Sequence, residues 1–133
     1  MHSLNMTIII ILVACFLPYI FSTIARLSSG YSAKKHGHPR EYMNQATGLA
    51  ARANAAQQNS FEGLPLFLAA MLLADYLVVR DSFVILLGAA YIVLRIVYGI
   101  CYLANWGSLR SVVWLLATAC PVLLLILCMK PIY

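Results

Sequence analysis

Charged residues are scarce in this sequence. Only 10% of its 133 residues are charged and four are acidic, whereas 63% are hydrophobic. Soluble globular domains carry about 25% charged residues, so the composition excludes them and predicts an integral membrane protein. The length accommodates one domain of a few spanning helices with short connections, and it leaves no room for a separate soluble domain.

Metal-binding and redox patterns are also missing. The four cysteines lie within apolar runs, at spacings that match no zinc or redox motif: Cys15, Cys101, Cys120 and Cys128. His36 and His38 lie two residues apart, but they have no third candidate ligand beside them. We therefore predict no metal site and expect the cysteines to be buried free thiols.

The net charge of +5 does not predict nucleic-acid binding, because Lys and Arg lie mostly at the ends of apolar runs. Such a distribution is typical of membrane topology. The first apolar run, Leu4 to Ala25, lacks a positively charged leader and an obvious small-residue cleavage site. We expect it to be a retained helix.

Four apolar segments predict four helices, over residues 4–26, 48–79, 82–104 and 110–129. About 20 helical residues, at a rise of 1.5 Å each, cross a hydrocarbon core about 30 Å thick. Residues 28–47 are polar and basic, which predicts a loop between the first two helices. The predicted fold is an all-α integral membrane protein, an up-down four-helix transmembrane bundle that spans residues 1–133 as a single domain.

Basic residues are unevenly divided between the two ends of this bundle. Arg80 and Lys130 lie at one end. The other end, with the long loop and the third turn, carries Arg26, Lys34, Lys35, Arg40, Arg52 and Arg110. The positive-inside rule then places the long loop in the cytoplasm and both termini in the opposite compartment.

The most unusual stretch is RANAAQQNSFEGLPLF, residues 52–67, in which amides and one carboxylate lead directly into an apolar segment. A charge at the centre of a spanning helix costs about 2.5 to 3.5 kcal/mol on insertion scales, so Glu62 requires a partner or a function. Helical spacing places Arg52, Asn59 and Glu62 on roughly one face.

The third helix carries a second polar stripe, formed by Tyr91, Arg95, Tyr98 and Tyr102. One interpretation is an ion pair between Glu62 and Arg95 that only fixes helix packing. Against it, the two stripes hold more hydrogen-bonding groups than a pair needs. Such an excess suits a polar, zwitterionic ligand.

These residues resemble the MAPEG family, the membrane-associated proteins of eicosanoid and glutathione metabolism. The resemblance lies in Asn59-x-x-Glu62 on the second helix and in RIVYGICYLANWGSLR, residues 95–110. It implies a homotrimer of four-helix subunits that binds glutathione in a U shape at each subunit interface, near the cytoplasmic side.

The same resemblance assigns the candidate site residues. Asn59 and Glu62 match the family's glutathione-binding Asn and Glu, and the family's ligands from the third helix correspond to Arg95, Tyr98 and Tyr102. Arg110 is the nearest match to an Arg that lies near the thiol in catalytically active members. Lys34 or Lys35 takes the place of basic residues that end the first helix.

One position departs from the family pattern. The family motif has an Arg four residues before the Asn, where this chain has Ala55, and Arg52 lies one turn earlier. We expect Arg52 to be the candidate replacement among the glutathione ligands.

The leading hypothesis is a glutathione-dependent transferase or peroxidase that acts on a small lipophilic electrophile or hydroperoxide from the bilayer. Glutathione would be the co-substrate, and the Arg110 guanidinium would stabilise its thiolate. Ala55 favours an alternative, a non-catalytic relative that binds a lipid or partner at the same groove. A proton-coupled transporter based on Glu62 is disfavoured, because such exporters usually carry their acid in the first helix. We expect a bacterial inner membrane.

Overall fold

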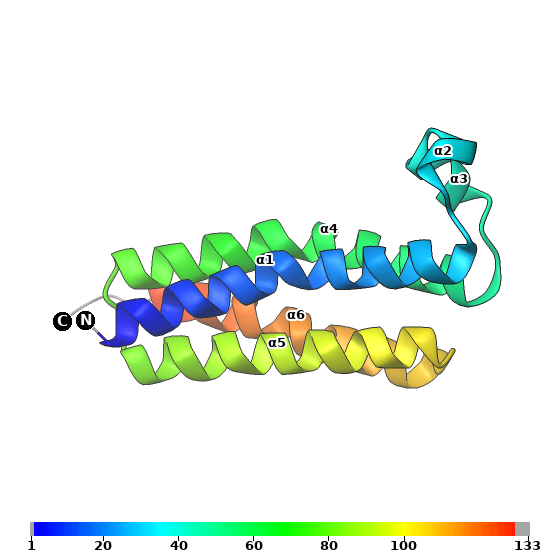
Figure 1. Ribbon diagram of the computed structural model, residues 1–133. Coiled ribbons are helices and arrows are strands. Elements are labelled where there is room, and N and C mark those ends of the chain that lie inside the picture. Colours follow the sequence, from blue (N-terminus) through cyan, green and yellow to red (C-terminus); the bar gives the residue numbers. More distant parts are fainter. Residues whose placement is uncertain (1, 130–133) are drawn as a thin grey trace.

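A computed structural model describes residues 2–129, and this part of the chain is helical apart from short turns. The helices are α1 (His2–Ser29), α2 (Ala33–His36), α3 (Pro39–Asn44), α4 (Gly48–Tyr76), α5 (Asp81–Leu103) and α6 (Gly107–Met129). Four of them are long and run side by side (Figure 1). The prediction of an all-α fold is confirmed.

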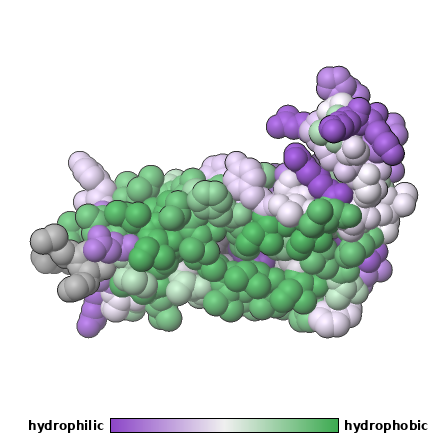
Figure 2. Space-filling model, in the orientation of Figure 1, coloured by the Kyte–Doolittle hydropathy of each residue, from purple (hydrophilic) through white to green (hydrophobic). Residues whose placement is uncertain are grey.

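Three helices within residues 2–129 are long and apolar enough to cross a membrane: Leu4–Ser29 of α1, and the whole of α5 and α6. Large apolar side chains are exposed along their outer faces, among them Phe16, Val93 and Leu115. Figure 2 shows this apolar surface along the bundle. The helix α4 is long, but the polar residues of its N-terminal half exclude it from this set.

The helix α4 contacts all three of the other long helices. It packs most extensively on α1, whereas α5 packs most extensively on α6. The core includes Phe67 and Met71 of α4 with Leu124 of α6, all fully buried. The rings of Phe67 and Tyr91 stack with centroids 4.0 Å apart, which fixes α4 against α5.

Glycine permits the close approach of α1 to α5. A Cβ atom on Gly99 would overlap the ring of Phe21, which is 5% exposed. Gly88, nearer the N-terminus of α5, has a similar role. A Cβ there would lie 3.0 Å from Met71 Cε of α4 and 3.1 Å from Ile10 Cγ2 of α1. Helix packing therefore requires a residue without a Cβ atom at both positions.

The polar connection predicted over residues 28–47 contains two short helices. The Tyr42 hydroxyl donates to the Ser29 carbonyl (2.8 Å), the Tyr31 hydroxyl donates to that of Gly37 (3.2 Å), and the His36 and Tyr42 rings lie 4.3 Å apart. The connection projects from one end of the bundle as a hydrophilic arm (Figures 1 and 2).

Several helix ends differ from the sequence prediction, and α6 begins at Gly107, three residues before its predicted start. The helix α1 continues to Ser29, and α4 ends at Tyr76, where Val78 adopts a left-handed φ of 57° and the Val79 amide donates to the Ala74 carbonyl (2.9 Å). Lys130, predicted at the end of the last helix, lies outside the described residues.

Candidate functional site

A buried arginine lies where α4 meets α5. Arg95 is 2% exposed, and its Nη2 donates to Asn59 Oδ1 (2.9 Å) and Ser60 Oγ (3.0 Å). The spacing on α5 turns Arg95 inward, and two consecutive polar residues on α4 face it. The two polar stripes therefore meet through an amide and a hydroxyl.

Among residues 2–129, no carboxylate pairs with the Arg95 charge. Glu62 is exposed, and no ion pair joins it to Arg95 in residues 2–129. Arg95 Nε is buried and makes no hydrogen bond. The structure therefore does not form the Glu62–Arg95 ion pair that the sequence offered as an interpretation, because Asn59 and Ser60 occupy the contact. A buried cation with neutral partners retains several kcal/mol of desolvation cost, which an anion would offset.

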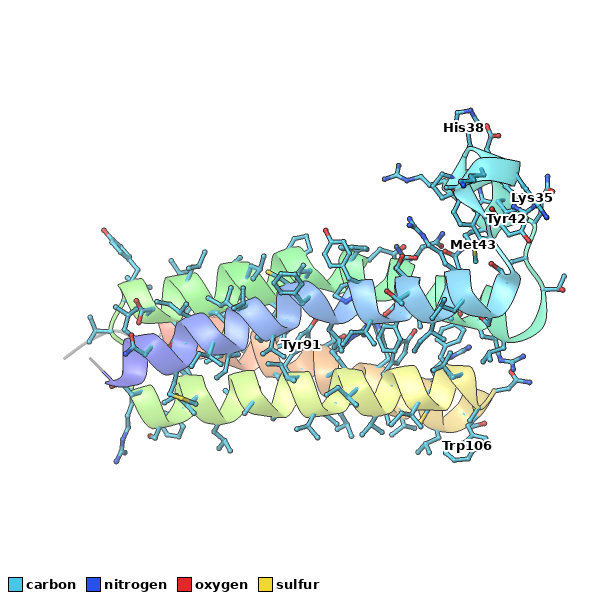
Figure 3. The ribbon with its side chains drawn as sticks, in the orientation of Figure 1. Lys35, His38, Tyr42, Met43, Tyr91 and Trp106 are labelled. Atoms are coloured by element: carbon cyan, nitrogen blue, oxygen red, sulfur yellow. The ribbon has the colours of Figure 1, made fainter. Side chains whose placement is uncertain are left out.

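A cavity of about 200 Å³ opens beside this arginine between α4, α5 and α6. Its wall consists of Asn59, Glu62, Gly63, Leu66, Tyr91, Arg95, Trp114, Thr118 and Pro121. Gly63 leaves room for the Tyr91 hydroxyl, since a Cβ there would lie 3.3 Å from that oxygen. Figure 3 labels Tyr91 midway along the bundle, between the helices. The cavity thus combines a cation, a carboxylate and an apolar wall.

A row of two aromatic rings between two guanidinium groups continues from the cavity along α5. Arg95 Cζ lies 4.3 Å from the Tyr98 ring centroid, and the Tyr98 and Tyr102 rings meet edge to face at 5.6 Å. Arg110 Cζ lies 4.4 Å from the Tyr102 ring centroid. These four side chains, here called the α5 stack, join the predicted third-helix residues to the predicted catalytic arginine.

The turn between α5 and α6 brings Arg110 back over α5. Asn105 has a left-handed φ of 62°, a conformation that Asn tolerates well. The Trp106 amide donates to the Cys101 carbonyl (2.8 Å), and Trp106 lies at this turn in Figure 3. Arg110 then falls in the first turn of α6 and is half-buried.

Two predicted ligands lie apart from the α5 stack. Arg52 Nε donates to the Leu103 carbonyl at the end of α5 (3.2 Å), so its side chain ties α4 to that helix end. Lys34 is exposed on α2, in the projecting arm. Figure 3 shows its neighbour Lys35 in this arm.

A second, larger hollow of about 810 Å³ lies between α1, α3 and α4. It is polar on the α4 side, with Asn54, Gln57 and Gln58, and basic where α1 and α3 contribute Arg26 and Arg40. Glu62 lines both this groove and the 200 Å³ cavity. Any part of this groove that lies within the hydrocarbon has polar groups whose hydrogen bonds lipid cannot satisfy.

Several residues of the site were missed at the sequence level. Ser60 shares the Arg95 contact, and its position next to Asn59 was the available signal. Trp114 and Thr118 are four residues apart on α6, one and two turns beyond Arg110. Asn54, Gln57 and Gln58 repeat at helical spacing on α4, which could have revealed its second polar face.

Comparisons with known proteins identify the family. A model of the MAPEG family matches residues 5–130, nearly the whole chain. Neither the curated proteins nor the solved structures give a match. Members of the family include glutathione transferases, peroxidases and leukotriene synthases. With its three long apolar helices, the protein is an integral membrane protein, and it belongs to the MAPEG family.

Proposed function

We propose that this protein is a glutathione-dependent transferase or peroxidase that acts on lipophilic electrophiles or hydroperoxides in the membrane. The observation that carries the proposal is Arg95, a buried cation without a carboxylate partner, whose Nε remains free beside a cavity. Such a group favours an anionic ligand. Family membership supports glutathione as that ligand.

The chemistry of the cavity fits part of glutathione. The tripeptide carries two carboxylates, one ammonium group and a thiol. Arg95 offers a charged donor for a carboxylate, and Glu62 offers an acceptor for the ammonium group. A water occupies about 30 Å³ of liquid, so the cavity of about 200 Å³ has room for several waters. This is roughly the space that one residue of the tripeptide needs. The remainder would extend along the α5 stack toward Arg110.

Arg110 would supply the activation of the thiol. A guanidinium favours the thiolate, which is the nucleophilic form. In the transferase reaction the thiolate sulfur bonds to an electrophilic carbon and displaces its leaving group. In the peroxidase reaction the thiolate attacks the hydroperoxide, which leaves an alcohol and a sulfenic acid, and a second glutathione converts the sulfenic acid to the disulfide and water.

We also propose that α4 completes an up-down four-helix transmembrane bundle and that three copies form a homotrimer. The amides that line the groove support this assembly: Gln58 is exposed, Asn54 and Gln57 are half-buried, and hydrocarbon cannot satisfy their hydrogen bonds. If the groove of one copy covers the cavity of the next, the contact is head-to-tail, and a rotation of about 120° between copies closes such contacts into a ring of three. Glu62, which lines both hollows, would then lie at the junction.

Calorimetry on the purified protein in detergent tests the proposal directly. Glutathione should bind the wild type, and Arg95→Met should abolish the binding heat. Arg80→Met is a matched control, because Arg80 is exposed at the opposite end of α5 and also lies over a ring, that of Phe83. Conjugation of glutathione to a chlorinated nitrobenzene then reports the transferase reaction. An absence of binding heat for the wild type at saturating glutathione would refute the proposed function.

A second candidate is a non-catalytic family member that binds a lipid or partner at the same groove. It is favoured by Ala55, which stands where the family carries Arg, while Arg52 is engaged with the Leu103 carbonyl. Restoring the cation by Ala55→Arg distinguishes the candidates. A gain of glutathione binding over a non-binding wild type would support this second candidate, and no gain would count against it.

A further inference from the structure

Arg110 owes its position to one aromatic ring. Within residues 2–129, its guanidinium makes no hydrogen bond and no ion pair, and its single ring contact is with Tyr102 at 4.4 Å. The side chain lies in the first turn of α6, at the end of the bundle. A long basic side chain at such a place can extend toward the aqueous interface instead. The Tyr102 ring is therefore what competes with water for this guanidinium.

The contact uses the face of the ring. The Tyr102 hydroxyl donates no hydrogen bond to any residue in the described part of the chain. The Tyr98 ring meets the Tyr102 ring edge to face, and Arg95 in turn lies over Tyr98. The α5 stack thus anchors the Tyr102 ring to the buried end of the site.

We propose that Tyr102 is a positioning residue, whose ring face rather than its hydroxyl holds the Arg110 guanidinium beside the glutathione thiol. This inference rests on the proposed function, and it adds to that function a specific physical role. Cation–π attraction acts within about 6 Å of the ring centroid and is strongest where water is excluded. The electrostatic effect of Arg110 on a thiolate falls with distance, so a guanidinium that turns outward would leave the thiol protonated.

Paired substitutions separate the ring from the hydroxyl. Tyr102→Phe keeps the ring, so the pH profile of its bound thiolate, followed by ultraviolet absorbance, should stay that of the wild type. Tyr102→Leu removes the ring, so it should raise the apparent pKa of the bound thiol and lower kcat/KM about two- to thirtyfold. Phe83→Leu is a matched control, because it removes the ring that faces Arg80 at the other end of α5.

A double-mutant cycle shows whether Tyr102 acts through Arg110. In an Arg110→Ala background, Tyr102→Leu should cause no further loss of kcat/KM, because the group that it positions is gone. If the two losses multiply, Tyr102 acts independently of Arg110 and the proposal is overturned. An equal rise of the apparent thiol pKa in Tyr102→Phe and Tyr102→Leu would also overturn it, because the hydroxyl would then be the acting group.

A measurement without glutathione separates this inference from the proposed function. In protein labelled with nitrogen-15 arginine, the side-chain N–H signal of Arg110 should carry a ring-current shift that Tyr102→Phe keeps and Tyr102→Leu loses. If the shift behaves in this way but glutathione does not bind, the proposed function fails and the placement of Arg110 stands. An Arg110 signal that does not change in Tyr102→Leu would refute the positioning role. Tyr102→Trp, which restores a ring, should recover the shift if Tyr102→Leu folds poorly.

Discussion

Replacing Arg95 by Met separates a binding arginine from a structural one. The side chain donates two hydrogen bonds from a charged group, each contributing about 1.5 to 3 kcal/mol, and it makes a buried cation–π contact that contributes about 2 kcal/mol. Against these stands the cost of burying a cation without a counter-ion, which is several kcal/mol. The opposing contributions nearly cancel.

The groups that Arg95→Met leaves behind have other partners. Ser60 can donate to the carbonyl one turn earlier in α4, as Ser does within helices. Asn59 lines the 200 Å³ cavity, which is large enough for water. We therefore expect the unfolding free energy without ligand to change by less than about 2 kcal/mol.

Thermal unfolding with and without glutathione provides the assay. A ligand at one hundred times its dissociation constant stabilises the native state by about 2.7 kcal/mol, so the wild type should melt at a higher temperature with glutathione. Arg95→Met should melt at the same temperature in both conditions, whereas Arg80→Met should behave as the wild type. A loss of more than about 4 kcal/mol in Arg95→Met without ligand would refute the reasoning, because Arg95 would then act mainly in packing.

Three further substitutions test the geometry around the site. Gly99→Ala should lower the stability by about 1 to 3 kcal/mol because its Cβ overlaps the Phe21 ring, and Phe21→Leu should restore part of the loss in a melting experiment. Gly63→Ala should weaken glutathione binding in calorimetry, since its Cβ lies 3.3 Å from the Tyr91 hydroxyl at the cavity wall; unchanged affinity would exclude this wall from the site. Asn105→Val should cost about 1 to 2 kcal/mol in thermal stability, because a β-branched residue is strained at a φ of 62°, whereas Asn105→Gly should not.

Helical periodicity explains what the sequence could predict. The stripe of Arg95, Tyr98 and Tyr102 follows from residues three and four apart, and its inward direction is as expected, with Arg95 and Tyr98 buried and Tyr102 half-buried. Asn59 as a member of the site follows from the same spacing on α4. Local pattern was therefore sufficient to find these four residues, although it missed the buried Ser60.

The choice of partners could not be predicted in this way. Asn59 and Glu62 share a helix face, and the way α4 packs against α5 decides that Arg95 meets Asn59 and Ser60 rather than Glu62. The same packing turns Arg52 to the Leu103 carbonyl. The contact of Arg110 with Tyr102 depends on the turn at Asn105, which no helical repeat describes.

The composition of α4 has a consequence for how the protein enters the membrane. Its neighbours are apolar enough to partition into lipid alone, but α4 carries amides toward the groove and polar contacts toward α5. In hydrocarbon without those neighbours, its polar side chains would lack hydrogen-bond partners, and each unsatisfied group would cost several kcal/mol. We therefore expect α4 to remain outside the lipid during synthesis until α5 is available to receive Asn59 and Ser60. We thus expect the membrane integration of α4, which carries the polar half of the site, to depend on the helices that pack against it.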